Sequence, residues 1–194
     1  AAVLPTPKTI ADIRIDAVKP TIVSVSGPPS GRYDAFVPNH ELEFKVSFDE
    51  EVTLTYSVTP NIVVTIGTET FTADLDTAAH TTGSSGTSFT FKIDLTTTPF
   101  ANAVSVTGVS VDSLNLGAGS TLVDNAGNEA DTTLTPASFP GVVVNQAEAT
   151  VAVSAKDETG GAKLLPATLA ETDVLIFTAT FSDDVTVTGA PSIN

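Results

Sequence analysis

The stretch ELEFKVSFDEEVTLT, Glu41–Thr55, decides how the rest of the sequence is interpreted. Apolar residues occupy every second position from Leu42 to Phe48, a period of two that is typical of a strand with one buried face. An acidic run follows at residues 49–51, and the alternation resumes at Val52. The pattern therefore predicts a strand, an acidic turn and a second strand.

The same pattern returns near the end of the sequence, at residues 173–188, DVLIFTATFSDDVTVT. The two stretches match column by column: Phe44 with Phe177, Val46 with Ala179, Phe48 with Phe181, Glu51 with Asp184, and Val52 with Val185. An internal repeat of this kind predicts an array of similar modules.

The segments that precede the two copies also match, and they locate the predicted module boundary. Asp16 aligns with Asn145, Thr21 with Thr150 and Ile22 with Val151. We therefore expect residues 1–12 to be a linker or the tail of a preceding module. Residues 13–141 are expected to form one module, and residues 142–194 the start of a second, incomplete one.

Composition favours an all-β protein and excludes several classes of function. The 194 residues are 41% hydrophobic and only 16% charged, with many Thr and Val, which favour strands. The net charge of −15 argues against binding to nucleic acid or to an anionic membrane surface. Because there is no Cys, disulfides, thiolate nucleophiles and zinc–thiolate sites are excluded.

Several further segments predict strands at a spacing of about ten residues, which is typical of a β-sandwich. Residues 61–67 and 69–75 are expected to pair through a turn at Gly67 and Thr68. Residues 88–95 alternate again. The expected core between two sheets consists of Phe44, Phe48, Phe89, Phe91 and Ile93.

The sequence resembles bacterial Ig-like repeat domains of large secreted or surface adhesins. The resemblance covers about residues 13–194 and is carried by residues 13–25, FKVSFDEEV at 44–52 with its second copy at 177–185, SGTSFTF at 85–91, and VDNAGNEA at 123–130. It implies tandem immunoglobulin-like Greek-key sandwiches that serve as spacer or adhesive modules at the bacterial cell surface. Some relatives bind calcium between modules.

Calcium is the metal that the oxygen-rich segments suggest, because it prefers carboxylate and carbonyl ligands. Asp124 and Asn128 belong to a loop rich in such groups, whose composition is equally explained by a hairpin turn. Asp16 and its counterpart Asn145 mark the module junctions, where an ion would fix the angle between modules. The acidic run at residues 49–51 is interpreted as a solvated turn, with part of a calcium site as the alternative.

Catalysis is not predicted, because the two histidines, His40 and His80, lie outside any recognisable catalytic motif and are interpreted as solvated loop residues. A carbohydrate-binding domain is disfavoured because the sequence has no Trp and only two Tyr to form an aromatic platform.

We therefore expect a non-enzymatic structural or adhesive module of an extracellular surface protein. Its partners would be neighbouring modules and a surface ligand that the sequence does not identify. The alternative is a self-assembling filament or surface-layer subunit, in which a neighbouring chain donates a strand to the incomplete second module.

Overall fold

The computed structural model describes residues 15–35, 40–98, 105–145, 149–157, 174–182, 185, 187–190 and 192. The chain divides into two compact units, Ala1–Gln146 and Ala147–Asn194, and each is considered by itself. Every regular element among the described residues is a β-strand, so the predicted all-β class is confirmed. In that part of the chain, no helix has the length and apolar character that crossing a membrane requires. The predicted linker at residues 1–12 lies outside the described residues.

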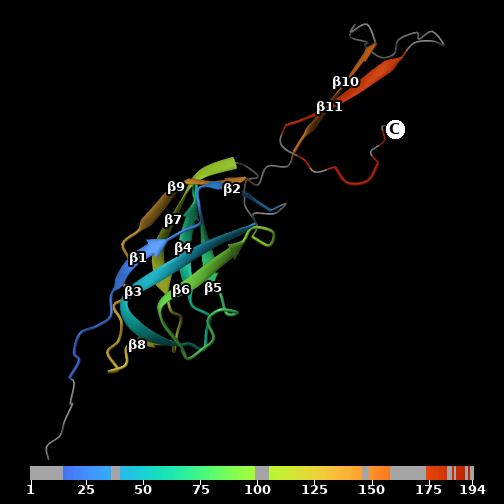
Figure 1. Cartoon of the computed structure of the whole chain (residues 1–194). Helices are drawn as coiled ribbons and strands as arrows, with labels where there is room; N and C mark the ends of the chain where they lie inside the picture. The colour runs from blue at the N-terminus through green and yellow to red at the C-terminus, as the bar shows by residue number, and fades with distance from the viewer. Residues whose placement is uncertain are drawn as a thin grey trace, which may run out of the picture. The chain divides into compact units, whose positions relative to one another are not determined.

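Unit 1 is a curled, mixed sheet (Figure 1). The strands follow the order β1-β3-β6-β5-β4-β7-β9-β2, with β8 paired to β3. Their bounds are β1 Ile22–Ser26, β2 Gly31–Asp34, β3 Glu41–Thr55, β4 Asn61–Ile66, β5 Glu69–Leu75, β6 Ser84–Asp94, β7 Ser105–Asn115, β8 Thr121–Val123 and β9 Ala137–Asn145. All pairs of strands are antiparallel except β2 and β9, which run parallel.

The curl brings the two halves of the sheet face to face. β5 and β6 share only two residue pairs, one of which joins Leu75 to Phe91. Beyond this narrow connection, β3 and β6 cross over β4 and β7 (Figure 1). Phe44 of β3 meets Phe139 of β9 with ring centroids 5.9 Å apart, although several strands separate them along the sheet.

The core forms because successive side chains of a strand point to opposite faces. Every expected core residue is buried, and the four apolar residues from Leu42 to Phe48 point inward as their alternation predicted. The turn at Gly67 and Thr68 also joins β4 to β5 as predicted. The largest fully buried side chains come from four strands, β3, β4, β6 and β7, and the loop after β6: Phe44, Phe91, Leu42, Leu54, Ile62, Ile66, Leu95, Val46, Val52, Val64, Val109 and Val111.

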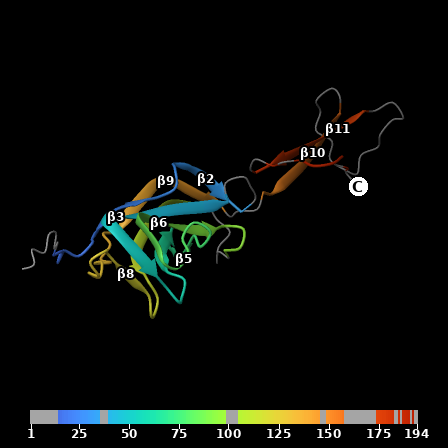
Figure 2. The ribbon, with the colours of Figure 1, turned by 60° about the horizontal axis from the view of Figure 1, so that its bottom comes forward.

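The predicted acidic turn within Glu41–Thr55 is wrong, because the whole stretch is the single strand β3. Both halves pair with β6, and between Ser47 and Val52 β3 advances by five residues while β6 advances by two. Residues 48–51 therefore form a bulge, which bends the strand (Figure 2). Buried side chains keep the same parity on both sides of this bulge, so one face of β3 stays on the core.

The division between the units falls after Gln146 rather than at residues 141–142, where the repeat alignment puts it. β9 runs through that position and continues to Asn145. Val142 and Val144 are buried in the core of unit 1, so they cannot belong to a separate second module.

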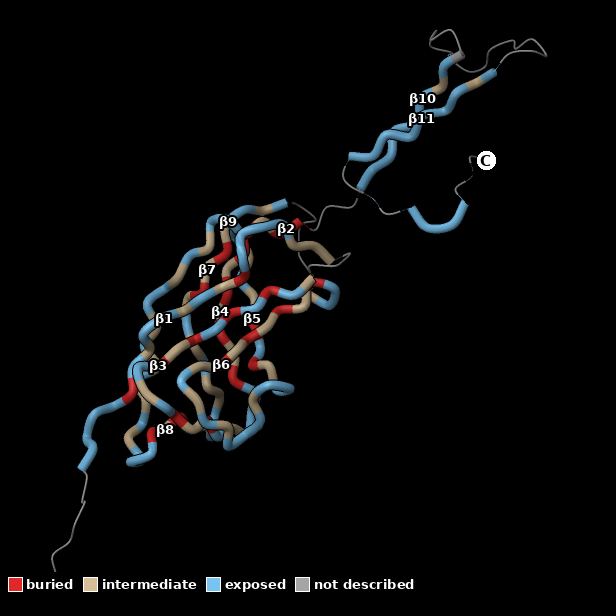
Figure 3. The backbone as a smooth tube through the Cα atoms, in the orientation of Figure 1, coloured by how far each residue is buried: buried red, intermediate tan, exposed pale blue. Residues whose placement is uncertain are grey.

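Unit 2 contains an antiparallel pair of strands, β10 Val151–Asp157 and β11 Leu175–Phe181. Val151 lies opposite Phe181, just as Ile22 of β1 lies opposite Phe48 of β3. These are the residues that the repeat alignment matches. The second acidic pair, at residues 183–184, lies outside the described residues. Figure 3 shows buried segments in the strands of unit 1 from β3 to β9, whereas the described residues of β10 and β11 are exposed or intermediate.

We predict that Phe44→Ala destabilises unit 1 by about 3–5 kcal/mol, because it removes a fully buried ring and leaves a cavity between the layers. The matched control is Lys45→Ala, the exposed neighbour on the same strand, which should change stability by less than about 0.5 kcal/mol. Urea unfolding followed by circular dichroism measures both. Equal effects of the two substitutions would contradict the assigned faces of β3.

Candidate metal centre

Three carboxylates that are distant in the sequence meet at one end of unit 1. Asp16 precedes β1, Glu50 lies in the bulge of β3, and Asp124 follows β8. One carboxylate oxygen from each residue lies within 4.8 Å of the others. Asp16 is exposed, Glu50 is half-buried and Asp124 is buried, so the cluster opens to solvent on one side.

The loop after β8 closes around the carboxylate of Asp124. Its Oδ1 accepts the backbone N–H groups of Ala126 at 2.7 Å and of Asn128 at 2.8 Å, and its Oδ2 accepts the side-chain amide of Asn128 at 2.7 Å. Gly127 has φ 91°, a left-handed conformation that glycine adopts without strain. Burial opposes ionisation, but the hydrogen bonds from Asn128 and from the Ala126 and Gly127 amides hold the pKa of Asp124 below its ordinary value.

The same asparagine ties the segment before β1 to this loop. Asn128 Nδ2 also donates to the carbonyl oxygen of Asp16 at 3.3 Å. The Asp16 carboxylate accepts the N–H of Val18 at 3.0 Å, a local hydrogen bond that orients this side chain. Asn128 thus orients both Asp16 and Asp124.

Glu50 is aimed at the cluster by the contact between Thr21 and Asp49. Thr21 donates its N–H to Asp49 Oδ1 at 2.8 Å and its hydroxyl to Oδ2 at 2.7 Å, while the Asp49 N–H donates to the Thr21 carbonyl at 3.1 Å. The backbone and hydroxyl hydrogen bonds from Thr21 lower the pKa of Asp49. With Asp49 fixed against Thr21, just before β1, the next side chain in the bulge lies close to Asp124.

The electrostatics of the cluster favour a cation. Desolvation, followed by repulsion from Asp16, Asp124 and Asp49, raises the pKa of Glu50. A divalent cation would remove that repulsion. Because the three side chains offer oxygen alone, the donor set fits a hard cation such as Ca²⁺ better than zinc or copper.

The structure brings together three of the four residues that the sequence suggested as ligands. Asp16 and Asp124 contribute carboxylates, while Asn128 donates its amide to both residues and acts as a positioning group. Asn145 lies elsewhere in unit 1, buried at the end of β9 opposite Ser105 and Asp34.

Glu50 is the member that sequence reasoning assigned first to a solvated turn. The sequence signal that could identify Glu50 is the alternation of inward and outward positions along β3. Glu50 falls on the same alternate positions of β3 as Phe48 and Val52, so its side chain belongs to the inward-facing set. An acidic residue at such a position is unfavourable without a compensating cation, and its neighbours here, Asp16 and Asp124, are themselves carboxylates.

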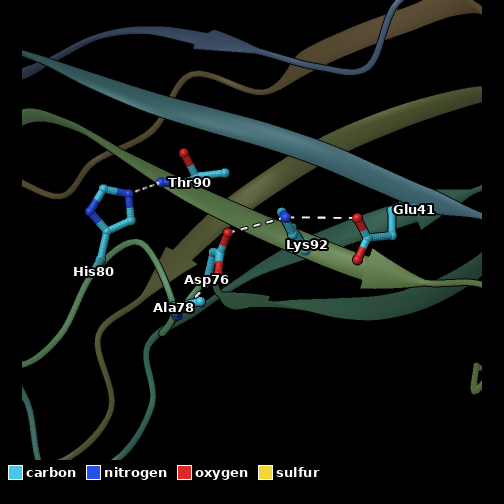
Figure 4. Close-up of polar contacts among 6 residues, drawn as sticks. All are labelled: Glu41, Asp76, Ala78, His80, Thr90 and Lys92. Carbon is cyan, nitrogen blue, oxygen red and sulfur yellow. Dashed lines mark hydrogen bonds and ion pairs between the residues drawn. The ribbon is translucent and has the colours of Figure 1, made fainter.

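His80 is not the solvated loop residue that we expected. Its ring is half-buried against Phe89, with centroids 5.2 Å apart, and its Nε2 accepts the N–H of Thr90 at 3.1 Å (Figure 4). The His80 carbonyl accepts the hydroxyl of Tyr56 at 3.0 Å. The ring therefore anchors the loop before β6.

An ion-pair group lies beside this anchor (Figure 4). Lys92 Nζ lies 3.2 Å from an Asp76 carboxylate oxygen and 3.7 Å from a Glu41 oxygen. The hydrogen bond with Lys92 lowers the pKa of Asp76 and raises that of Lys92, so both groups stay charged. The group joins β3, β6 and the loop after β5 at the surface.

Comparisons with known proteins find no relative of this chain. No model of a protein family matches it, and neither the curated proteins nor the solved structures include a match.

We predict that His80 makes unit 1 less stable in mild acid. Burial lowers the pKa of His80, so the folded chain takes up this proton less readily than the unfolded chain. The stability that the neutral His80 ring contributes is full above the ordinary histidine pKa of about 6.5. It is lost as the pH falls from there toward the lower pKa that His80 has in the folded chain.

Urea unfolding between neutral and mildly acidic pH tests this prediction. The side-chain amide oxygen of His80→Gln can accept the Thr90 N–H. This variant should therefore lose the part of the acid-induced fall in unfolding free energy that is due to His80. His40→Gln serves as the control and should retain it. Identical pH profiles for the parent chain and His80→Gln would contradict the assignment.

Proposed function

We propose that this chain is a non-enzymatic tandem of Ig-like β-sandwich modules from a bacterial extracellular surface protein, where it serves as a stiff spacer or cell-adhesion stalk. Unit 1 is one module and unit 2 begins the next. Neighbouring modules of the same protein are its main partners, and an adhesive role adds a surface ligand.

The Ig-like part of the proposal is supported by the strand order of unit 1. In immunoglobulin domains one sheet contains strands A, B, E and D and the other contains C, F and G. Here β1, β3, β6 and β5 are neighbours in the order A-B-E-D, and β4, β7 and β9 are neighbours in the order C-F-G. The sheets meet through β5, which pairs with both β6 and β4.

The tandem part is carried by one observation: the contact between Thr21 and Asp49 recurs in unit 2. The N–H of Ser182 donates to the carbonyl of Thr150 at 2.9 Å, as Asp49 does to Thr21. The N–H of Thr150 donates to the Ser182 hydroxyl at 2.9 Å, where Thr21 uses the Asp49 carboxylate. Recurrence of one contact at aligned positions supports a repeated structural unit.

A non-enzymatic role agrees with the local geometry of the chemical groups. The His80 ring is engaged by Thr90 and Phe89, and the nearby carboxylate of Asp76 is engaged by Lys92. These contacts stabilise loops rather than prepare a nucleophile.

We further propose that calcium binds at Asp16, Glu50 and Asp124, with Asn128 holding the first and last of these in position. The ion would supply positive charge to three carboxylates that repel one another. Because Asp16 lies before β1, binding would fasten the incoming chain to unit 1 and limit bending there.

A self-assembling filament or surface-layer subunit is the second candidate. It is favoured by the apolar side chains that β10 and β11 leave exposed, among them Val151, Val153, Phe177 and Phe181. A strand donated by a neighbouring chain would cover them.

We predict that calcium raises the melting temperature of unit 1, because an ion that binds only the folded state stabilises it by mass action. At roughly 100 times its dissociation constant the gain would be about 2.7 kcal/mol. Glu50→Gln should behave differently in two ways. It should melt above the parent chain in chelator, because one repelling charge is gone, and it should lose most of the response to calcium.

The matched control is Glu51→Gln, the exposed neighbour, which should respond to calcium as the parent chain does. Differential scanning calorimetry with calcium or chelator measures all three proteins. If calcium does not change the melting temperature of the parent chain, the proposed site is wrong.

A further inference from the structure

The ring of His80 takes the place of a backbone carbonyl beside β6. Two residues that form a hydrogen-bonded pair in an antiparallel ladder exchange both of their N–H···O bonds. Just beyond the residue pairs that β5 shares with β6, Asp76 and Thr90 make half of such an exchange, because the Asp76 N–H donates to the Thr90 carbonyl at 2.9 Å. The His80 ring makes the other half, since its Nε2 accepts the Thr90 N–H at 3.1 Å (Figure 4).

The Asp76 carbonyl does not accept the Thr90 N–H because the chain turns away from β6 at this residue. It accepts instead the N–H groups of Ala79 at 3.1 Å and of His80 at 2.8 Å. The turn brings the His80 ring against Phe89, a core residue, with ring centroids 5.2 Å apart. One side chain thus satisfies a backbone donor of β6 and packs against the core.

This arrangement requires a neutral imidazole. A neutral ring has one nitrogen that accepts a hydrogen bond, whereas both nitrogens of the protonated ring are donors. Because Nε2 accepts from Thr90, the neutral His80 ring carries its hydrogen on Nδ1. A proton added to Nε2 would point one N–H at another and would leave the part-buried Thr90 N–H without its acceptor, which is unfavourable.

Two charged groups among the described residues act on the ring, in opposite directions. Burial has the largest effect and lowers the pKa of His80, attraction by Asp76 raises it, and repulsion by Lys45 of β3 lowers it. The Asp76 carboxylate lies 3.2 Å from Lys92 Nζ, and the hydrogen bond with Lys92 lowers the pKa of Asp76. In mild acid the proton therefore goes to His80 rather than to Asp76.

The loop is held on both sides of His80 by contacts that do not depend on the charge of the ring. Before it, Asp76 is fastened to β6 through Lys92. After it, the Gly83 N–H donates to the carbonyl of Leu54 in β3 at 2.7 Å. A movement of the His80 ring can therefore stay confined to the loop between these two points.

We propose that the loop between β5 and β6 is a latch that a proton opens. In neutral surroundings the His80 ring closes the loop onto β6. In mild acid Nε2 takes up one proton from the solvent and the ring leaves Thr90 and Phe89, while the strands of unit 1 stay paired. This side of the sheet then presents a free backbone N–H and an uncovered apolar ring. The latch is independent of the proposed calcium site and of the proposed spacer role.

The latch should open progressively below the ordinary histidine pKa. The released ring has that ordinary value, about 6.5, whereas the ring held on β6 has a lower pKa. The neutral ring therefore favours the closed latch above the ordinary pKa. As the pH falls toward the pKa of the closed ring, the ratio of open to closed latches should rise up to about tenfold per pH unit.

Amide hydrogen exchange measures this opening residue by residue, because local and global openings expose different sets of amides. The full 194-residue chain is labelled with ¹⁵N and followed by NMR at several pH values. The exchange rate of the Thr90 amide, divided by that of an unstructured peptide at the same pH, should rise up to about tenfold per pH unit below about 6.5.

The Phe91 amide separates latch opening from unfolding. Neighbouring residues of a strand direct their N–H groups to opposite sides, so the Phe91 amide faces β3, where Phe91 lies opposite Phe44. Thr90 should exchange at least about tenfold faster than Phe91 at each pH. A low concentration of urea should accelerate exchange at Phe91 and leave Thr90 unchanged, because latch opening exposes little surface.

Two variants accompany the measurement. His80→Gln keeps an oxygen that can accept the Thr90 N–H but does not titrate in mild acid, so its Thr90 exchange ratio should not depend on pH. His40→Gln, the matched control, should retain the rise seen in the parent chain. Slow exchange at Phe91 in both variants shows that the sheet remains folded.

Three results would overturn the latch. The Thr90 exchange ratio could stay constant with pH in the parent chain, or it could rise equally in His80→Gln. Thr90 and Phe91 could also exchange at one rate with one response to urea, which would mean that the proton acts only through unfolding of the whole of unit 1.

Discussion

Everything in unit 1 depends on β3 keeping one face on the core across its bulge. Leu42, Phe44 and Val46 lie before the bulge and Val52 and Leu54 after it, and all five are buried on the same side. A shift of one residue would expose one of these sets. β3 can therefore pair with β6 along one edge and with β1 and then β8 along the other. The bulge lets β3 bend between the part that pairs with β1 and the part that pairs with β8, while its apolar side chains stay on the core.

The same bulge connects the fold to the candidate metal centre. Asp49 is fastened to Thr21 of the segment entering β1, and Glu50 then faces Asp124 and Asp16. A side chain on an inward position of β3 thus becomes the third acidic group of a cluster that includes Asp16 of the segment before β1. In this account, the bulge serves both to curve the sheet and to hold the module's approach segment in place.

Much of the fold could be predicted from the sequence, because alternation and turn-forming residues are local patterns. Alternation identified the buried face of β3 and β6, and the Gly67 turn identified the β4–β5 pair. An acidic run between two alternating segments, however, has the same composition whether it forms a turn or a bulge. Which one occurs depends on the pairing of β3 with β6, a long-range contact that local composition does not reveal. Asp124 and Asn128 were found because their loop is local, whereas Glu50 was weighed mainly as part of a solvated turn, since its proximity to Asp124 depends on the bulge.

The central claim is that the ribbon of β1 and β3 is the repeated unit of this chain. It is tested most directly by NMR of the full chain, using couplings across hydrogen bonds and cross-strand contacts. The account predicts a bond from the Asp49 amide to the Thr21 carbonyl and one from the Ser182 amide to the Thr150 carbonyl, with Ile22 opposite Phe48 and Val151 opposite Phe181. A register in unit 2 shifted by one residue would place Phe181 on the face opposite Val151 and would contradict the claim.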